Sequence, residues 1–291
     1  MSLPRIDWRG VIIPKVSELL DSYSYRPTLR QVFYRLVAAL LIPNTETTYK
    51  SLSRATVQAR EEAIIDPLCF DDRVRTYHGG DHGYESPQEY LDTLLAELRD
   101  APEGYTKRMW DNQQRTPIIW LEKDALFTPV SRIADRFRVR TYAARGYSSF
   151  TAVYEAAKTM DGSNAFVVLQ LTDFDPSGQD MVRDLERRLT RYGAEDFVLM
   201  KIALTQDQVQ TLGLPPMPAK TADPRYDRFA ASYGSEAVEL DALPPDELER
   251  IVRDAIWTRI DNDQWTEDYG RIESEQEKVR DRITALLDKI E

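Results

Sequence analysis

The sequence predicts an α/β protein, α+β overall, in which a helical N-terminal domain precedes a mostly parallel sheet flanked by helices. Two observations favour this class. From Thr116 onward, short apolar runs alternate with helical stretches in the order βαβαβα, which is typical of a parallel sheet with right-handed crossovers. Before that point, apolar residues recur at helical spacing. The chain has 291 residues, of which 42% are apolar, so about two domains with ordinary cores are expected.

The N-terminal segment predicts two helices followed by a short hairpin. Thr28 is a candidate N-cap for a helix whose apolar residues between Leu29 and Leu40 follow the i, i+3, i+4, i+7 pattern. The turn-rich stretch from Val74 to Tyr84, which contains Gly79-Gly80-Asp81, is typical of a β-ribbon. Helices followed by such a ribbon have the order of a winged helix.

The second helix of this segment is expected from about Thr48 to Ile65. Lys50, Arg54 and Gln58 lie one turn apart on it and therefore share one face. A basic helical face of this kind suits a DNA groove, so Lys50 and Arg54 are the candidate DNA-binding residues.

A further helix begins at Ser86-Pro87-Gln88-Glu89, which combines an N-cap serine, a proline at the first helical position and a glutamate three residues after the cap. Leucines at 91, 94, 95 and 98 give it an apolar stripe, and the polar stretch from Arg99 to Gln114 then marks a boundary. The expected domains are residues 1–110 and residues 115–291.

The second domain contains four apolar runs separated by helical stretches. The runs are Ile118–Leu121, Val139–Ala143, Ala165–Leu171 and Phe197–Ala203. The helices are expected at about 125–137, 149–160 and 178–192, with two more at about 245–261 and 266–290 beyond a proline-rich passage.

The composition excludes several classes of protein. No apolar run approaches the 18 or so residues that span a bilayer, so no membrane attachment is expected. Cys69 is the only cysteine, and His78 and His82 are the only histidines, which leaves too few soft ligands for a zinc site. A reduced, cytoplasmic location is expected.

The charge is divided unevenly along the chain. The net charge is −11, but residues 1–60 contain nine Lys and Arg against four Asp and Glu. A basic N-terminal segment therefore precedes an acidic remainder, but this charge distribution alone does not decide whether the first domain binds nucleic acid.

Acidic side chains follow two of the predicted strands. Glu122 comes directly after the first strand, and Asp173 and Asp175 follow the third with the same orientation along extended backbone. Because open α/β sheets bind ligands at the carboxyl ends of their strands, the three carboxylates are expected to converge. Oxygen ligands without His or Cys select Mg²⁺ or Mn²⁺.

Other interpretations of Asp173 and Asp175 exist. Both are also compatible with simple capping of the helix that begins near Gly178. Their spacing resembles the start of an EF-hand loop, but position 12 is Asp184 and the preceding segment is a strand. An aspartyl-phosphate hydrolase would leave Glu122 and the basic N-terminal segment unexplained.

Ile118 to Lys123, followed by Asp173-Phe174-Asp175-Pro176-Ser177-Gly178, resembles the Toprim domain, in which a strand-end glutamate and a later Asp-x-Asp bind Mg²⁺. The variant most similar to it is that of the topoisomerase VI A subunit and its meiotic double-strand-break relatives. Arg145-Gly146-Tyr147 resembles the glycine-bearing loop of that family, and Arg30-Gln31-Val32-Phe33-Tyr34 resembles its nucleophile motif. The chain departs from the family in its short length, its proline-rich passage and its C-terminal helices.

The resemblance implies a winged-helix domain bearing a nucleophilic tyrosine and a Toprim domain bearing the metal. Tyr34 would attack a DNA phosphate to form a 5′-phosphotyrosine link, with Arg30 steadying the phosphate. In the family the tyrosine and the metal meet across a dimer, so a homodimer is implied, and a separate ATPase subunit is a possible partner.

Helix geometry supplies a separate expectation for Tyr34. At about 100° per residue, Tyr34 points roughly 130° away from the apolar stripe of its helix and is expected outside the core. Arg30 lies one turn earlier, where its charge favours the phenolate. The alternative is a surface tyrosine that packs on the neighbouring domain.

The sequence thus predicts a Mg²⁺-dependent DNA-cleaving protein that acts by tyrosine transesterification. One alternative is a Toprim nuclease that hydrolyses DNA with a metal-activated water, with Tyr34 structural or DNA-contacting. The other is a non-catalytic DNA-binding accessory protein.

Overall fold

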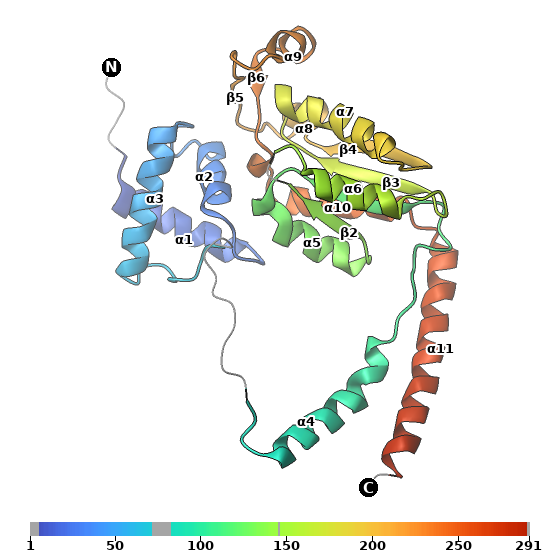
Figure 1. Cartoon of the computed structure of the whole chain (residues 1–291). Coiled ribbons are helices and arrows are strands. Elements are labelled where there is room, and N and C mark those ends of the chain that lie inside the picture. The colour runs from blue at the N-terminus through green and yellow to red at the C-terminus, as the bar shows by residue number, and fades with distance from the viewer. Residues whose placement is uncertain (1–5, 72–82, 145, 290–291) are drawn as a thin grey trace, which may run out of the picture. The chain divides into compact units, whose positions relative to one another are not determined.

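The computed structural model describes residues 6–71, 83–144 and 146–289 (Figure 1). It divides into two compact units. The first unit comprises Met1–Val74 and Pro117–Thr258, and the second comprises Arg75–Thr116 and Arg259–Glu291. This division differs from the expected domains of residues 1–110 and 115–291, because the helix that begins at Pro87 packs with the C-terminal helix and not with the N-terminal helices.

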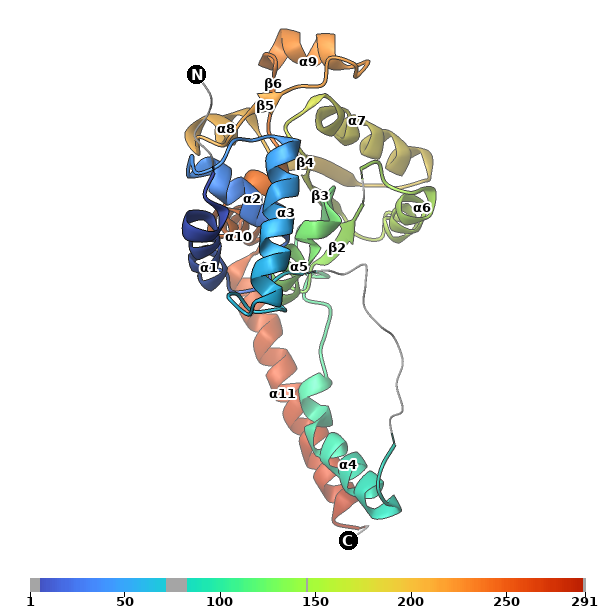
Figure 2. The same ribbon diagram turned by 90° about the vertical axis from the view of Figure 1, so that its left-hand side faces the viewer.

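The first unit begins with helices that pack on one another (Figure 2). They are a π-helical turn at Trp8–Ile12, α1 (Ile13–Ser22), α2 (Leu29–Ala38) and α3 (Glu46–Glu61). Thr28 caps α2 in a full capping box with Gln31, as its position in the sequence predicts. The expected hairpin at residues 74–84 lies, apart from its last two residues, outside the described residues, so the winged-helix arrangement stays a prediction.

The four predicted strands form one sheet in the order β2-β1-β3-β4. The strands are β1 (Thr116–Leu121), β2 (Arg140–Ala143), β3 (Phe166–Leu171) and β4 (Phe197–Ala203). β1 pairs with β2 and β3 pairs with β4 in parallel. The predicted α/β class with a mostly parallel sheet is therefore confirmed.

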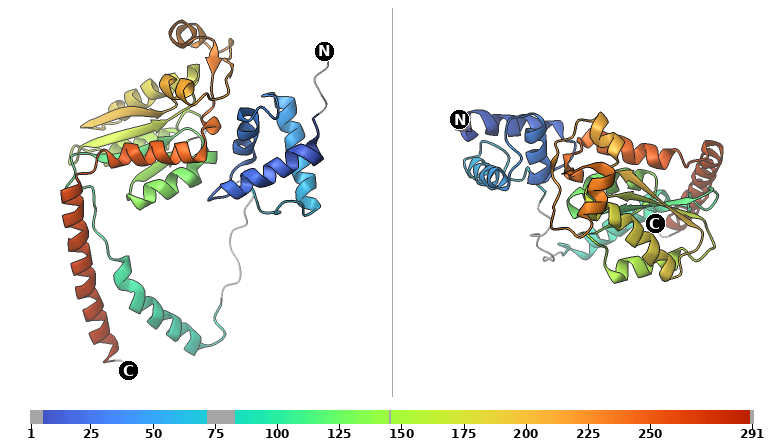
Figure 3. Two further views of the ribbon diagram at one scale, coloured as in Figure 1. Left: turned by 180° about the vertical axis from the view of Figure 1, so that it is seen from behind. Right: turned by 90° about the horizontal axis from the view of Figure 1, so that it is seen from above.

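Helices cover both faces of this sheet (Figure 3). On one face, α6 (Phe150–Thr159) and α7 (Pro176–Arg191) pack on side chains of β1 and β3, among them Trp120 and Val168. On the other lie α5 (Phe127–Arg136) and α10 (Pro245–Trp257), which contact each other closely. Because β3 is buried on both sides, its sequence is continuously apolar except for Gln170.

The chain between β4 and α10 forms an excursion from the sheet, for which the sequence analysis predicted no helices or strands. It contains α8 (Gln206–Thr211), β5 (Met217–Pro218), α9 (Tyr226–Tyr233), β6 (Glu236–Ala237) and a 3₁₀ turn, η5 (Leu240–Ala242). β5 and β6 pair in an antiparallel ribbon. Phe174 and Val238 exchange two backbone hydrogen bonds of 2.9 Å, which fix the excursion to the loop after β3.

The second unit contains α4 (Pro87–Asp100), the 3₁₀ turn η3 (Ala101–Gly104) and α11 (Asn262–Leu287). Ser86 caps α4, as predicted. The part of the chain that follows α4 runs antiparallel to α11. Glu103 pairs with Arg280 at 2.6 Å, and Asn112 donates to Asp268 at 3.0 Å. None of the residues of α4 is buried, so its predicted leucine stripe remains largely exposed.

Among the residues that the structure describes, every helix is too short or too polar to cross a bilayer.

Candidate active site

Glu122 and the Asp173–Asp175 loop lie together at the carboxyl end of the sheet. Glu122 follows β1, and its backbone N–H donates to the carbonyl of Leu171 in β3 at 2.9 Å. Its Oε2 accepts a hydrogen bond of 2.8 Å from the N–H of Asp173. These acidic residues therefore lie close together, as predicted, because the strands that precede them are neighbours in the sheet.

The loop after β3 is held in one conformation by its own polar groups. Asp175 Oδ1 accepts hydrogen bonds from Gly178 N at 2.6 Å and from Ser177 Oγ at 3.0 Å. Asp175 is thus the N-cap of α7, as the capping alternative predicted. A Cβ at Gly178 would lie 2.2 Å from the carbonyl oxygen of Asp173, so only glycine fits there.

Asp173 makes different contacts from the other two carboxylates. Its Oδ1 accepts from Leu240 N at 2.8 Å, and its Oδ2 pairs with Lys123 Nζ at 2.7 Å. Burial and the neighbouring Glu122 raise the pKa of Asp173 to about 7, although Lys123 opposes this shift. Both oxygens of Asp173 therefore already have protein partners.

Within the described residues, no group of three or more Asp, Glu, His or Cys side chains is arranged to hold one ion. Sharing of one ion by Glu122, Asp173 and Asp175 stays a prediction, and in this structure Asp173 is directed at Lys123 and Leu240. Glu122 and Asp175 are therefore the two carboxylates that have an oxygen available for a metal ion. Glu122 Oε1 accepts no hydrogen bond from the described residues, and Asp175 Oδ2 has only a 3.3 Å contact with Ser177 Oγ.

Two carboxylates suit Mg²⁺, which is usually bound by one or two of them together with waters and substrate phosphates. Burial raises the pKa of Glu122, and the negative charge of Asp175 adds to that shift. A divalent cation between the two would relieve this unfavourable charge. The donor set therefore fits Mg²⁺ or Mn²⁺ held by Glu122 and Asp175.

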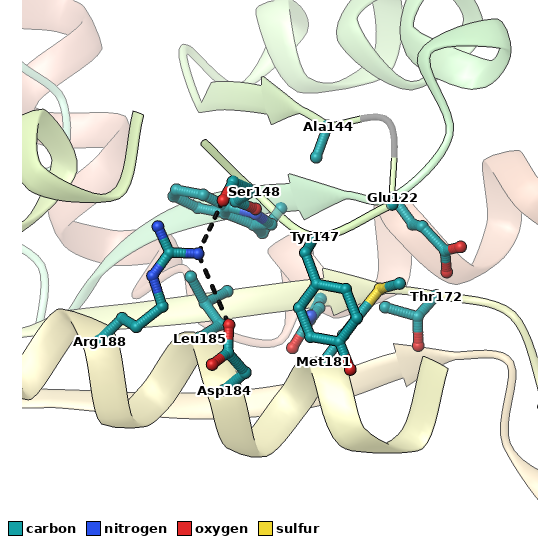
Figure 4. A pocket seen from close by; sticks show the side chains of 12 residues that line it. Glu122, Ala144, Tyr147, Ser148, Thr172, Met181, Asp184, Leu185 and Arg188 are labelled. Carbon is teal, nitrogen blue, oxygen red and sulfur yellow. Dashed lines mark hydrogen bonds and ion pairs between the residues drawn. The ribbon is translucent and has the colours of Figure 1, made fainter. Parts of the chain in front are cut away.

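A small cavity adjoins Glu122, with a volume of about 10 Å³, near that of a single water molecule. Figure 4 shows Glu122 at one end of it and Arg188 at the other. Arg188 donates to the carbonyl of Ser148 at 2.7 Å and pairs with Asp184 at 3.5 Å. Gln170 also lines the cavity, and its Oε1 is buried without a hydrogen-bond partner among the described residues.

Lys201 is a half-buried cation of the site that sequence analysis did not identify. It lies in β4 and donates to the carbonyl of Asp173 at 2.9 Å. Burial lowers its pKa to about 8, while Glu122, Asp173 and Asp175 act in the opposite direction. The signal available in the sequence was a lysine inside an otherwise apolar strand.

Tyr34 is only 4% exposed, so the prediction that it lies outside the core was wrong. The helical-wheel argument considered one apolar face, but α2 packs on α1 and α3 and also on η5. Burial raises the pKa of Tyr34 to about 12, and Glu239 adds to this effect while Arg30 opposes it. The expected stabilisation of the phenolate by Arg30 is therefore outweighed.

Arg30 lies beside Tyr34, as predicted, with its guanidinium carbon 5.9 Å from the ring centroid. Its charge is directed elsewhere. It pairs with Glu239 at 2.5 Å and approaches Asp241 at 3.6 Å. Asp241 is almost fully buried, and neither carboxylate oxygen has a hydrogen-bond partner among the described residues.

Glu239 also pairs with Lys123 at 2.8 Å, and Lys123 pairs with Asp173. Arg30, Glu239, Lys123 and Asp173 therefore form a continuous ion-pair chain from α2 to the acidic site. Burial by itself would lower the pKa of Lys123, but Asp173 and Glu239 raise it above its ordinary value. No sequence motif marked Glu239 or Asp241, because their role depends on contacts with residues far away in the chain.

A cavity of about 250 Å³ lies over Tyr34 and is lined by Arg30, Tyr49 and Glu239 among others. The predicted nucleophile and its arginine thus face an open space, even though the ring of Tyr34 is mostly covered.

Lys50, Arg54 and Gln58 are exposed on α3, which confirms that they share a solvent face. Lys50 pairs with Glu46 at 2.7 Å, so part of its charge is balanced. DNA binding by this face stays a prediction.

A scan against protein-family models found no match to this chain, and a search of curated proteins found none.

Proposed function

We propose that this chain cleaves DNA phosphodiesters with Mg²⁺ or Mn²⁺, and that a water molecule is the nucleophile. The observation that supports it best is the pair of carboxylates, Glu122 and Asp175, at the ends of neighbouring parallel strands. Hydrolysis would consume one water and divide a phosphodiester into a phosphate monoester and a hydroxyl.

In this proposal Glu122 and Asp175 hold the divalent ion. When bound there, the ion would stabilise the negative charge that develops on the phosphate. Asp173 is a positioning residue, because it fixes the loop through Leu240 and Lys123. Lys201 offsets the negative charge of the site from the β4 side.

Water is preferred over Tyr34 for two reasons. The pKa of Tyr34, about 12, makes its phenolate scarce at neutral pH. Arg30, which would steady the phosphate, is paired with Glu239. A nucleophilic Tyr34 would therefore require release of the ion-pair chain.

Transesterification by Tyr34 remains the second candidate. It is favoured by the cavity that Tyr34 and Arg30 line, because a phosphate entering that space would meet both groups. The product would be a 5′-phosphotyrosine link, and the resemblance to the topoisomerase VI A subunit implies a homodimer and an ATPase partner for such a reaction.

The test compares Asp175→Asn and Tyr34→Phe on end-labelled duplex and single-stranded DNA with Mg²⁺ or Mn²⁺. We expect Asp175→Asn to lose at least about 100-fold in cleavage rate, as for removal of one charge-stabilising group. Tyr34→Phe should cleave at nearly the parental rate and leave no protein on the DNA. Asp207→Asn, on exposed α8, is the matched control and should match the parent.

Loss of cleavage in Tyr34→Phe, together with a covalent adduct in the parent, would instead support transesterification. DNA binding without any cleavage in the parent would support the non-catalytic accessory protein.

A further inference from the structure

A cavity of about 380 Å³ lies between α7 and α9, and three arginines line it. Arg183 belongs to α7, Arg225 immediately precedes α9, and Arg228 lies within α9. We call it the arginine cavity. Pro176 also lines it and directly follows Asp175, so the cavity begins next to the candidate metal ligand.

The arginine cavity has an excess of positive charge. Asp180 pairs with Arg183 at 2.7 Å and with Arg225 at 3.2 Å, and Arg225 also pairs with Asp223 at 3.1 Å. Three guanidinium groups thus share two carboxylates. Arg228 is exposed and makes no ion pair with any residue in the part of the chain that the structure describes. An anionic ligand would find a free arginine there.

An aromatic ring lies at the same cavity. Tyr233 is 39% exposed, and its ring packs on Phe229 at 5.3 Å and on Phe174 at 5.4 Å. The ring is therefore held by two neighbouring rings while part of it stays exposed. Exposed, rigid aromatic rings beside arginines are typical surfaces for stacking a nucleobase next to its phosphate.

The acidic loop and the arginine cavity are parts of one assembly. Phe174, between Asp173 and Asp175, is buried and packs on Phe229 at 5.5 Å. The two backbone hydrogen bonds between Phe174 and Val238 hold the chain that follows α9. Pro176, which directly follows Asp175, lines the cavity, so a nucleic-acid strand held at Asp175 would lie next to it.

We propose that the arginine cavity binds a single-stranded stretch of the DNA strand that is cleaved at Glu122 and Asp175. Arg228 and Arg183 contact its phosphates, and Tyr233 stacks on one of its bases. This inference rests on the proposed function and extends it, because it assigns the substrate strand a path over the start of α7 and onto α9.

The test measures binding of a fluorescein-labelled 12-nucleotide single strand by anisotropy over a salt series, with EDTA present so that no cleavage occurs. We expect Arg228→Ala to weaken binding severalfold and to reduce the slope of log K against log salt by about 0.7, the loss of one phosphate contact. Tyr233→Ala should weaken binding without changing this slope, and Tyr233→Phe should bind like the parent.

Arg253→Ala, at an exposed arginine of α10, is the matched control and should leave affinity and slope unchanged. Parental affinity in Arg228→Ala would overturn the inference. So would competition by thymidine monophosphate as strong as that by the oligonucleotide, since the cavity would then be a nucleotide site. Absence of any oligonucleotide binding by the parent would overturn it as well.

The cleavage assay separates this inference from the proposed function. Parental binding by Arg228→Ala, with normal Mg²⁺-dependent cleavage, would contradict the arginine cavity alone. Binding weakened severalfold in Arg228→Ala, with no cleavage by the parent, would contradict the cleavage function alone.

Discussion

The hydroxyl of Tyr34 lies where a negative charge is poorly stabilised. Glu239 is close enough to raise its pKa, and the ring is almost fully covered. Arg30, the nearest cation, interacts with two carboxylates at the same time. The residue that the family resemblance marks as a nucleophile is therefore held as a neutral phenol in this structure.

This arrangement predicts a pH effect on stability. Because the pKa of Tyr34 is raised from 10 to about 12 in the folded protein, its stabilising contribution is complete below pH 10 and is lost as the pH rises toward 12. When the pH is raised from 9 to 11, the free energy of unfolding, measured by urea denaturation, should fall less for Tyr34→Phe than for the parent. Tyr269→Phe, at an exposed tyrosine, should behave like the parent. An equal loss in Tyr34→Phe and parent would contradict this assignment.

The segment from β6 to η5 is the element that joins α2 to the acidic loop. Its backbone pairs with Phe174, its Leu240 N–H donates to Asp173, and its Glu239 bridges Arg30 and Lys123. Arg30 and Lys123 are thereby both held by a short stretch of chain that has little regular secondary structure. Any rearrangement of this segment would change the partners of Arg30 and of Asp173 together.

Glu239→Gln tests how strongly this segment is coupled to the acidic site. The substitution preserves the size of the side chain but removes the negative charge of Glu239. Lys123, which is 19% exposed and pairs with both Glu239 and Asp173, would then keep only Asp173 as a close ion-pair partner. We expect the free energy of unfolding to fall by about 1–3 kcal/mol. The effect should be smaller when Lys123→Met is already present, since the two residues interact directly. Additive effects of the two substitutions would exclude the coupling.

The control for that experiment is Glu249→Gln. Glu249 pairs with Arg136 at 3.4 Å, and both side chains are largely exposed. Exposed ion pairs contribute little, so the change in unfolding free energy should stay below about 1 kcal/mol.

At the scale of the whole molecule, local signals in the sequence predicted the elements well. The four apolar runs correspond closely to the strands. For β1 and β3 the reason is that strands buried on both faces must be continuously apolar, whereas β2 and β4 are only partly buried. Thr28 and Ser86 begin helices because capping depends on only three or four neighbouring residues. The proximity of Glu122 to Asp173 followed from the sheet alone.

Contacts between distant segments were not predictable in the same way. The burial of Tyr34 depends on η5, about 200 residues further along the chain. The pairing of α4 with α11, and the roles of Lys123, Glu239 and Asp241, likewise depend on tertiary packing. A helical wheel contains no information about a second packing partner, which explains the incorrect prediction for Tyr34.

The distribution of charge over the whole chain leads to the final prediction. With a net charge of −11, the protein as a whole repels DNA, so binding must depend on local basic surfaces such as the exposed face of Lys50 and Arg54. Lys50→Glu with Arg54→Glu should weaken duplex binding at low salt by at least about tenfold. The slope of log K against log salt should fall by roughly 1.8, the loss of two phosphate contacts.

Arg250→Glu with Arg253→Glu on α10 changes the net charge by the same amount at exposed positions of another helix. This control should bind DNA nearly as the parent does, with the same salt slope. An equal loss in both double variants would mean that net charge, and not the α3 face, governs affinity. Undiminished binding by the Lys50→Glu, Arg54→Glu variant would place the main duplex-binding surface elsewhere on the chain, with the arginine cavity then the first surface to examine.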